Sequence, residues 1–396
     1  MDRHKILYIH HDGLITGSAI SLKNLLIKLN REKFEPIVLI GFEGPIRKFY
    51  EEIGVKVISF DIGTFVTQPT PFLFSRDYYY NLRALFFSNT NLLDKILKEI
   101  KPDLIHVNDK SALIAGEYAA KCGYKVIWHL RSTYHGKRSY LLYLISKFKI
   151  SKSSKHLISI SEDETDGFEN FKDLSVIYNS IDIDLADKVL KSGSSFRREF
   201  NIEPNEIAIG MIGNLNRQKG AWNFIKASSL AVKMESNLKF RFFLIAPIPP
   251  QVKGVDNVEL TETFNLIKVG GLTDSMVLTG RRSDVLNVMA GLDIISACYG
   301  MNAIGRPALE AASMGKPVIV NAGYSGKSRI VLNMVTGIVI EKENPLALAN
   351  SIILLAKSKE LREKIGAEAF KYARENFNSN INTLRIESIY NSLLNT

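Results

Sequence analysis

Short apolar runs alternate with segments of helical periodicity along most of this chain, and the series occurs twice. Strands that alternate with helices form right-handed βαβ units and a mostly parallel sheet. The pattern therefore predicts an α/β fold with two doubly wound halves. The apolar runs of the first series are KILYIHH, EPIVLIGF, VKVISFD, DLIHVND, KVIWHLR, HLISIS and LSVIYNS. Those of the second are EIAIGMIG, FRFFLIAP, MVLTG, LDIISACY, KPVIVNA and TGIVIE.

The length of 396 residues is more than one ordinary core organises, so about two domains are expected. A polar segment, KSGSSFRREFNIEPNE, separates the two series and indicates a linker. We predict an N-terminal domain over 1–185, a linker over 186–204, a C-terminal domain over 205–375 and a closing helix over 376–396. The closing stretch is long enough to reach back to the first half.

Composition and cysteine usage are those of a soluble intracellular protein. Hydrophobic residues make up 46% of the chain and charged residues 23%. Cys122 and Cys298 lie far apart and suggest neither a disulfide framework nor a metal pattern, which favours a reducing cytoplasm. The N-terminus does not read as a signal peptide, and no apolar run approaches the ~20 residues of a transmembrane helix. We expect a cytoplasmic protein, with the cytoplasmic face of the inner membrane as a second possible place.

The net charge of +10 is unevenly distributed. Between Glu117 and Glu162 there are nine Lys or Arg and no acidic residue. Within that window, residues 137–155 alternate basic with apolar and aromatic side chains. This segment is either an interfacial helix facing an anionic membrane or a solvated helix packed on the core. No nucleic-acid module is recognisable, so nucleic acid is not an expected partner.

The segment from Phe65 to Phe87 is dense in aromatic residues and contains two prolines. One interpretation is a loop and helix that cover the core of the first domain. The other is a surface that faces an acceptor, because aromatic faces stack on sugars and sit at membrane interfaces.

The stretch from Tyr299 to Val320 predicts a phosphate site. It reads as a glycine-bearing loop that opens a helix, followed by a buried strand. Pro307 suits the start of that helix, and Gly305 lies just before it, where free N–H groups and the helix dipole can hold a phosphate. Glu310 follows one turn into the helix and can reach back toward the loop.

A second glycine-bearing loop follows the first apolar run. Gly17 and Ser18 open the next helix, and small residues there let backbone amides approach a phosphate or an acceptor. The loop lacks the G-x-G-x-x-G pattern, which argues against a nicotinamide cofactor.

The chain resembles the retaining glycosyltransferases of the family-4 type, which have the GT-B architecture. The resemblance implies two Rossmann-like domains that face each other across a cleft, the first on the acceptor side and the second binding a nucleotide sugar. It implies no cofactor and no metal. The segments that carry it, in order and spacing, are KPDLIHVND, KVIWHLR, SISEDETDGF, VIYNSIDID, IGNLNRQKGAWNFIKA, TGRRSDVLNVMAGLDIISACY and YGMNAIGRPALEAASMGKPVIV.

The family signature, Glu-x7-Glu, implies roles for the phosphate-facing loop. Glu310 is the second Glu and is expected to accept hydrogen bonds from the nucleotide ribose. Asn302 stands at the first position, where the family has a carboxylate that holds the donor sugar. Asn keeps hydrogen-bonding capacity but carries no charge. The backbone of Ala303, Ile304 and Gly305 is expected to face the phosphates and the sugar.

A second departure lies in GNLNRQKG, where the family has an Arg and a Lys that hold the diphosphate. Lys219 keeps its place at a strand-to-helix junction before a glycine, and Asn214 stands where the Arg would be. Arg217 is either a substitute for that Arg or a solvated loop charge. Arg281 lies in the segment near which the family holds the nucleotide base. Arg329 stands where the family usually has an acid.

In the first domain, His129 matches the family's histidine that contacts the donor sugar near the reacting carbon. Arg131 lies two residues further along and is a candidate for the acceptor side, since ligands gather at the carboxyl ends of strands in such folds. His10, His11 and Asp12 end the first strand and are candidates for the acceptor side. The pair Asp182 and Asp184 falls where the family has a structural segment, so no metal site is expected there.

The resemblance implies a transferase that moves a sugar from a nucleotide diphosphate sugar, with UDP favoured over GDP, to a glycan or lipid-linked glycan. We expect retention at the anomeric carbon and a place in bacterial cell-surface polysaccharide or lipopolysaccharide biosynthesis. The departures at Asn302, Asn214 and Arg329 leave open a catalytically weak, donor-binding homologue that acts as a scaffold or partner. A nucleotide-sugar epimerase of similar build fits the motif order less well.

Overall fold

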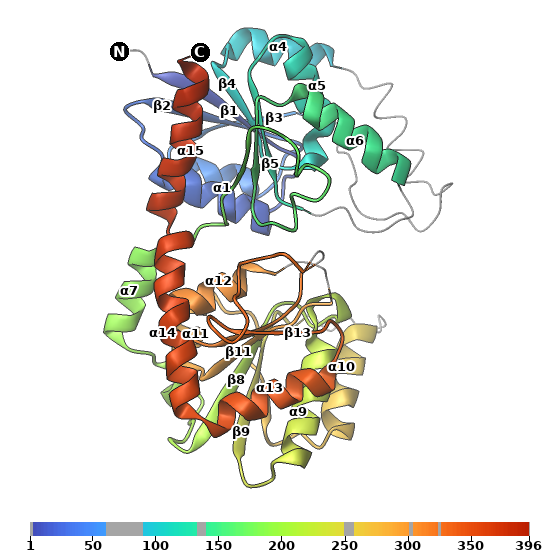
Figure 1. Ribbon diagram of the computed structural model, residues 1–396, viewed down its shortest axis with the longest axis vertical. Coiled ribbons are helices and arrows are strands. Elements are labelled where there is room, and N and C mark those ends of the chain that lie inside the picture. The colour runs from blue at the N-terminus through green and yellow to red at the C-terminus, as the bar shows by residue number, and fades with distance from the viewer. Residues whose placement is uncertain are drawn as a thin grey trace. The chain divides into compact units, whose positions relative to one another are not determined.

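The computed structural model describes residues 3–60, 90–132, 140–248, 257–300, 304–323 and 326–395, with side chains from 143 in the third range. They form two compact units, one of residues 1–180 with 379–396 and one of residues 181–378. Each unit is built on a parallel sheet with helices on both faces (Figure 1). The predicted α/β fold with two doubly wound halves is confirmed.

The sheet of the first unit has the strand order β3-β2-β1-β4-β5-β6-β7 among the described residues, and every pairing is parallel. The order reverses between β1 and β4, which is the switch point where ligands bind in doubly wound folds. The strands are β1 (His4–His10), β2 (Phe34–Ile40), β3 (Lys56–Ser59), β4 (Leu104–Val107), β5 (Val126–Leu130), β6 (His156–Ser159) and β7 (Leu174–Val176).

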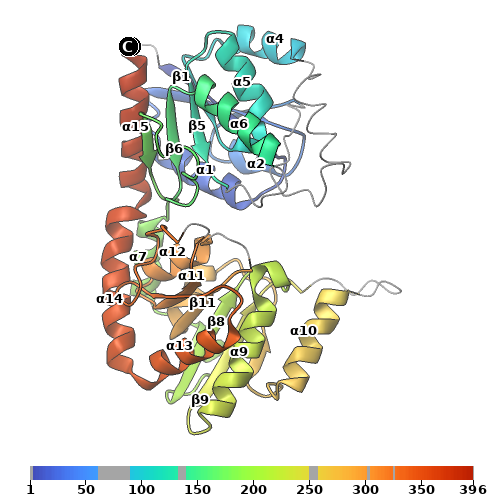
Figure 2. The same cartoon turned by 45° about the vertical axis from the view of Figure 1, so that its right-hand side comes forward.

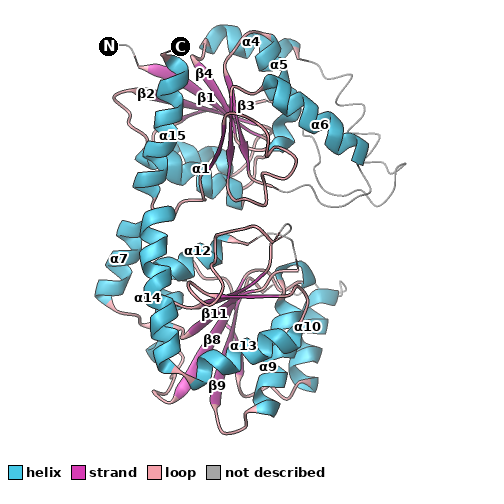
Figure 3. Ribbon diagram, viewed as in Figure 1, coloured by secondary structure: helices cyan, strands magenta, loops and turns pink. Residues whose placement is uncertain are grey.

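Helices cover both faces of this sheet (Figure 3). The described ones are α1 (Gly17–Lys28), α2 (Ile46–Glu51), α4 (Asn91–Ile100), η1 (Lys110–Ala112), α5 (Leu113–Lys121), α6 (Tyr140–Ser153) and α15 (Ser379–Leu394). α4 shows why these segments are helical: Leu93, Leu97 and Ile100 fall on one side and are buried.

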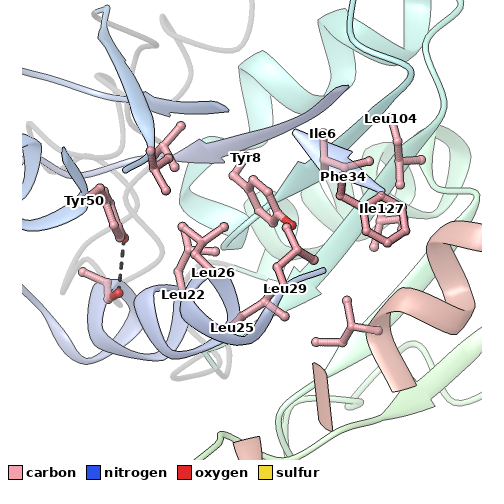
Figure 4. Packing of buried hydrophobic residues seen from close by; sticks show 14 of the residues in the cluster. Ile6, Tyr8, Leu22, Leu25, Leu26, Leu29, Phe34, Tyr50, Leu104 and Ile127 are labelled. Carbon is pink, nitrogen blue, oxygen red and sulfur yellow. Dashed lines mark hydrogen bonds between the residues drawn. The ribbon is translucent and has the colours of Figure 1, made fainter. Parts of the chain in front are cut away.

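The alternation of side chains along β1 supplies the cores on both faces of the sheet. Leu7 and Ile9 belong to the core that includes α4 and α5. Ile6 and Tyr8 belong to the opposite core, which includes α1, α2 and α15 and is drawn in Figure 4. In that core the Tyr50 hydroxyl donates to the carbonyl of Ala19 at 3.2 Å, which ties α2 to α1.

The C-terminal helix α15 belongs to the first unit, as predicted. It lies beside the first sheet in both views (Figure 2), and Ile386 and Tyr390 are buried in the core with α1. The ring of Tyr390 meets that of Phe34 edge-on, with ring centroids 5.7 Å apart. The last helix therefore completes the core that the first strands begin.

The sheet of the second unit has the order β10-β9-β8-β11-β12-β13 among the described residues, all parallel, and its switch point lies between β8 and β11. Its strands are β8 (Glu206–Ile212), β9 (Lys239–Ile245), β10 (Met276–Leu278), β11 (Ile294–Ala297), β12 (Val318–Asn321) and β13 (Ile338–Ile340). Its helices are α7 (Ile183–Ser192), α8 (Phe196–Glu199), η3 (Arg217–Lys219), α9 (Ala221–Met234), α10 (Val258–Val269), α11 (Val285–Gly291), α12 (Arg306–Ser313), α13 (Pro345–Lys357) and α14 (Lys359–Asn376).

Residues 186–204, which the polar composition predicted to be a linker, instead lie within the second unit and contribute to α7 and α8. The carboxylate of Asp182 caps α7 by accepting the N–H of Leu185 at 3.2 Å. Phe196 of α8 is fully buried and lies against Gly291. The buried side chain of Phe196 fixes this segment in the second unit, although its polar composition is typical of a linker.

The stretch predicted as a closing helix over 376–396 contains α15, and a separate helix, α14, precedes it. α14 ends at Asn376 and α15 begins at Ser379. Between them the carbonyl of Phe377 accepts the N–H of Ile181 at 2.7 Å, and Phe377 is fully buried. The carbonyl is used outside the helix, which marks the point where the chain passes from the second unit to the first.

None of the described helices is both long and apolar enough to cross a membrane.

Candidate functional site

Two loops meet at the switch point of the second unit, one after β8 and one after β11. Gly220 ends η3 with a φ of +76°, and a Cβ built there would lie 2.0 Å from the carbonyl oxygen of Cys298. Likewise, a Cβ at Gly300 would lie 2.6 Å from the carbonyl oxygen of Arg217. Only glycine permits this approach, so the two loops form one backbone-lined surface.

Lys219 lies on this surface. The side chain of Asn216 caps η3 by accepting the N–H of Lys219 at 2.8 Å, which fixes the backbone from which the lysine extends. The Lys219 Nζ lies 5.1 Å from the centroid of the Tyr299 ring. Burial lowers the pKa of Lys219. The lysine is a partly desolvated cation at the start of α9, suited to a phosphate.

Tyr299 is the support of the second loop. It is buried, and its hydroxyl donates to the carbonyl of Ile212 at the end of β8, at 3.2 Å. Its own carbonyl accepts a hydrogen bond from the Asn321 side chain at the end of β12. A Cβ at Gly305 would lie 2.3 Å from the Tyr299 ring, so the glycine lets the entry to α12 pass over the ring.

α12 begins at Arg306, with Gly305 as its N-cap residue, no side-chain cap and Pro307 in the first turn. The positive end of the helix dipole suits an anion, although Pro307 has no N–H and the N–H of Ala308 donates to the carbonyl of Gly305 at 3.1 Å. Glu310 lies one turn in, half-buried, and accepts a hydrogen bond from Arg306 at 3.3 Å. Ile304, Gly305 and Glu310 thus lie where the sequence placed them, around the start of a helix.

The other predicted residues of the second unit differ in setting. Asn214 and Arg217 are exposed, and Arg217 pairs with Glu343 at 3.7 Å, which supports the solvated-charge interpretation for Arg217. Arg281 is exposed after β10, whereas its neighbour Arg282 is bound to Glu199 and Asp284. Arg282 is therefore a structural residue.

Three of the sequence predictions concern residues outside the described ranges. These are Asn302, Ala303 and the aromatic segment from Phe65 to Phe87. The basic segment 137–155 is described in part, as helix α6 from Tyr140.

At the switch point of the first unit, polar side chains from four strand ends form one hydrogen-bonded cluster. Arg131, just after β5, donates through Nε to Asn108 Oδ1 at 2.8 Å and through Nη1 to Asn179 Oδ1 at 2.8 Å. Asn108 Nδ2 in turn donates to His10 Nδ1 at 2.8 Å. His10, at the end of β1, is fully buried.

A second arm leads from Arg131 to the C-terminal helix. Arg131 Nη2 lies 3.2 Å from His129 Nδ1, and His106 Nε2 lies 3.1 Å from the same atom. His106 Nδ1 is 2.6 Å from the Tyr390 hydroxyl, which is hydrogen-bonded to the Tyr8 hydroxyl at 3.2 Å. Four strand ends and α15 therefore share one network.

Electrostatics keep these histidines neutral. Burial lowers the pKa of His10 to about 3, with His11 and Arg131 acting in the same direction. Burial and the Arg131 cation lower the pKa of His106 to about 3, and burial, Arg131 and His106 lower that of His129 strongly. In this surrounding His129 can donate or accept a hydrogen bond but cannot serve as a cation near neutral pH.

The remaining predicted residues of the first unit lie between the end of β1 and the start of α1. The Asp12 carboxylate accepts the N–H of Leu14 at 2.8 Å, and the ring of His11 lies 5.1 Å from that of His10. Gly17 is the first residue of α1, with open space where a Cβ would be, and the Ser18 hydroxyl bonds to that of Thr16 at 2.9 Å.

Sequence reasoning missed Asn108, His106 and Tyr390. His106 and Asn108 fall at the end of a recognised strand, so the rule that ligands gather at carboxyl ends could have found them. Nothing local marks Tyr390, whose partner His106 is 284 residues away. Among the described residues no group of three or more His, Cys, Asp and Glu is placed to hold a metal ion.

Two family models match the chain in succession. "Glycosyltransferase Family 4" matches residues 15–185, and "Glycosyl transferases group 1" matches residues 194–372. The HepE protein of Anabaena, solved in complex with UDP, aligns over 98% of this chain and 100% of its own, with a TM-score of 0.79 and 20% identity. The fold is that of the GT-B glycosyltransferases, and the chain belongs to the family-4 type of that class.

Two curated relatives are similar over most of their length. The capsular polysaccharide biosynthesis glycosyltransferase CapM of Staphylococcus aureus is 25% identical over 329 residues, covering 78% of this chain and 83% of that protein. An Escherichia coli protein, UDP-Gal:alpha-D-GlcNAc-diphosphoundecaprenol alpha-1,3-galactosyltransferase, is 25% identical over 288 residues, covering 68% and 70%.

Proposed function

We propose that this glycosyltransferase takes its sugar from a UDP-sugar, which binds at the switch point of the second unit. The observation that carries this is the pair of glycine-linked loops that bring Lys219 and the uncapped start of α12 to one surface, with Glu310 one turn in. Backbone amides and a cation suit a diphosphate, and a carboxylate suits ribose hydroxyls. HepE, which has the same fold, has been solved with UDP and with UDP-glucose.

We propose transfer with retention at the anomeric carbon and without a metal. Lys219 and the first turn of α12 would stabilise the departing diphosphate, and a phosphate oxygen would take the proton of the acceptor hydroxyl. His129 would hydrogen-bond the transferred sugar. Asn302 would hold sugar hydroxyls in place of the carboxylate found in the family, with hydrogen bonds but without charge.

For the acceptor we propose a glycan or lipid-linked glycan of bacterial surface polysaccharide synthesis, in the cytoplasm at the inner membrane. CapM and the diphosphoundecaprenol-dependent relative support this choice. A surface feature supports the membrane contact: a groove of about 710 Å³ between α5 and α6 is lined by Leu144, Phe148 and three lysines. Two of these, Lys121 and Lys149, pair with Glu117, and the third is Lys152. Apolar side chains amid lysines suit an anionic bilayer surface.

The membrane contact can be tested by co-sedimentation with phosphatidylglycerol and phosphatidylcholine vesicles. Phe148 is 65% exposed, and we expect Phe148→Glu to abolish binding to the anionic vesicles. Val269 of α10 is 75% exposed in the other unit, so Val269→Glu is the matched control and should bind as the wild type does. Equal binding of both variants, or none by the wild type, would favour a solvated helix.

Donor binding can be tested by thermal unfolding with a panel of UDP-, GDP- and ADP-sugars. We expect a UDP-sugar to raise the melting temperature most, because binding to the folded state alone stabilises it. If no nucleotide sugar does so, the proposed donor is wrong.

A second candidate function is that of a donor-binding scaffold with little activity. The replacement of a charged residue by Asn302 and by Asn214 favours it. Turnover of the stabilising sugar by the wild type, Asn302→Ala and Asn302→Glu separates the two functions. An active wild type that loses activity in Asn302→Ala is a transferase in which Asn302 works. An inert wild type that gains donor hydrolysis in Asn302→Glu is a scaffold.

A further inference from the structure

Arg131 lies at the branch point of the buried cluster in the first unit. A guanidinium can only donate hydrogen bonds and stays charged at any working pH. Each group that Arg131 contacts must therefore accept, which determines protons and amide orientations throughout the cluster.

The first branch determines His10. Because Arg131 Nε donates to Asn108 Oδ1, the Asn108 amide must present its NH₂ to His10. The same NH₂ lies 3.4 Å from the carbonyl of Ser18, an acceptor, which agrees with this orientation. His10 Nδ1 therefore accepts, and the proton of the neutral ring is on Nε2.

The second branch determines His129 and His106. Arg131 Nη2 donates to His129 Nδ1, so His129 also carries its proton on Nε2. His106 Nε2 faces the same accepting nitrogen and must be protonated. His106 Nδ1 is then an acceptor 2.6 Å from the Tyr390 hydroxyl, whose single proton can serve either His106 or the Tyr8 hydroxyl. The contacts of Arg131 with Asn108 and His129 determine the tautomers of His10 and His129.

The outcome is two buried N–H groups without an assigned use. The Nε2 atoms of His10 and His129 are buried and have no hydrogen-bond partner among the described parts of the chain. A buried donor left unpaired costs about 1–3 kcal/mol, so a site that maintains two of them is expected to satisfy them with a ligand.

We propose that Arg131 is a positioning residue that locks His10 and His129 in the neutral Nε2–H tautomer, so that both present hydrogen-bond donors to oxygen atoms of the substrate. The histidines then act as fixed donors and not as proton shuttles. The ligand groups that fit them are acceptors, namely sugar hydroxyl, ring or phosphate oxygens. The identity of the ligand rests on the proposed function, whereas the tautomers do not.

The tautomers can be measured directly, without any ligand, by long-range ¹H–¹⁵N NMR on protein labelled at histidine, with each ring assigned by single substitution. We expect a pyridine-type Nδ1 and a pyrrole-type Nε2 for His10, His106 and His129. A wild-type spectrum with the Nδ1–H form at His10 or His129 would overturn the proposal.

Substitutions separate the two branches. Arg131→Lys keeps the charge but cannot make all three side-chain contacts, so we expect mixed tautomers at both histidines. Asn108→Ala should alter His10 alone. Tyr390→Phe removes the hydroxyl that contacts His106 and Tyr8 and should leave His129 in its Nε2–H form. Unchanged histidine spectra in Arg131→Lys would contradict the role of Arg131.

Kinetic measurements then test whether the fixed tautomers contribute to turnover. With UDP-glucose or whichever UDP-sugar stabilises the protein, Arg131→Lys should reduce kcat/KM roughly tenfold, the value of about one misplaced hydrogen bond. The wild type should show no limb due to histidine in its kcat–pH profile between pH 5 and 8. Such a limb, or unaltered kcat/KM in Arg131→Lys, would overturn the positioning role. If no nucleotide sugar binds at all, the proposed donor fails while the NMR result stands.

Discussion

Gly220 and Cys298 belong to different loops, yet a Cβ on Gly220 would lie only 2.0 Å from the Cys298 carbonyl oxygen. Two constraints meet at this glycine, since its φ of +76° already disfavours any side chain. The contact joins the end of η3 to the loop that leads into α12. It is the structural reason why the lysine and the helix start act on one surface.

We predict that Gly220→Ala will weaken UDP binding as well as fold stability. The left-handed backbone alone costs about 1–2 kcal/mol, and the clash with Cys298 must also move one loop away from the other. Gly271 is the matched control, because its φ is +69° and nothing lies within 4 Å of a Cβ there. Gly271→Ala should cost only the backbone term and leave UDP affinity intact. Thermal unfolding and UDP titration calorimetry measure both effects.

Lys219→Ala should reduce UDP affinity by roughly 10- to 100-fold, the value of about 1.5–3 kcal/mol for a hydrogen bond to a charged group. Lys219→Arg should retain part of that affinity, because the cation remains. Arg217 is 71% exposed in its side chain and pairs with Glu343 across 3.7 Å, so Arg217→Ala should have little effect. If Arg217→Ala were as damaging as Lys219→Ala, Arg217 would hold the diphosphate after all.

UDP affinity should also depend on pH through Lys219. Burial lowers the pKa of this amine below that of an exposed lysine. Lys219 is a cation below that pKa and neutral above it, so the affinity should fall as pH rises through the lowered value. Lys219→Met should remove this alkaline dependence. Identical pH profiles for the two proteins would show that the amine does not contact the ligand.

Glu310→Gln should weaken the binding of UDP but not of inorganic diphosphate, because a ribose contact is lost while the phosphate contacts stay. We expect roughly a tenfold loss for UDP, the value of one charged hydrogen bond. Glu363 offers a control, since it also pairs with a basic residue four positions away, Lys359, but on an exposed surface. Glu363→Gln should bind UDP normally, and an equal loss for diphosphate would relocate Glu310 to the phosphates.

The buried histidines should make the first unit sensitive to acid. The pKa values of His10, His106 and His129 are lowered by folding, so below about pH 6.5 the unfolded chain binds protons that the folded unit does not. Stability is then present above pH 6.5 and falls as pH drops, by up to about 1.4 kcal/mol per pH unit for each histidine. Carboxylates titrate in the same pH range, so the test compares the pH dependence of the unfolding free energy between the wild type and a histidine variant. His106→Gln should show a slope smaller by about one proton between pH 6.5 and 4, in denaturant titrations, and parallel curves would contradict this.

The local sequence pattern was sufficient to predict the strands and to place residues at their ends. Apolar runs indicated each strand, and His129, Arg131 and Lys219 could be placed at strand ends because that position is a property of the neighbouring sequence. Glu310 could be placed one helical turn from Gly305 for the same reason. These features depend on spacings of a few residues.

What could not be predicted depends on contacts distant in sequence. No local signal links Tyr390 to His106, or tells that Phe196 will find a buried place against Gly291. The hydrogen bond from Ile181 that ends α14 joins positions far apart in the chain. The tautomers of His10 and His129 could not be predicted either, because they follow only from the side-chain contacts of Arg131 taken together.

The membership of α15 in the first unit has a consequence for biosynthesis. The ribosome makes the first strands early in translation. It makes α15, which supplies Ile386 and Tyr390 to the core of those strands, only after the whole second unit. Until then, α1 and α2 cover that face of the nascent sheet without α15, and His106 lacks its phenol partner. The first unit therefore waits in an incomplete state during translation, with apolar surface for chaperones to shield, and the histidine cluster becomes complete last.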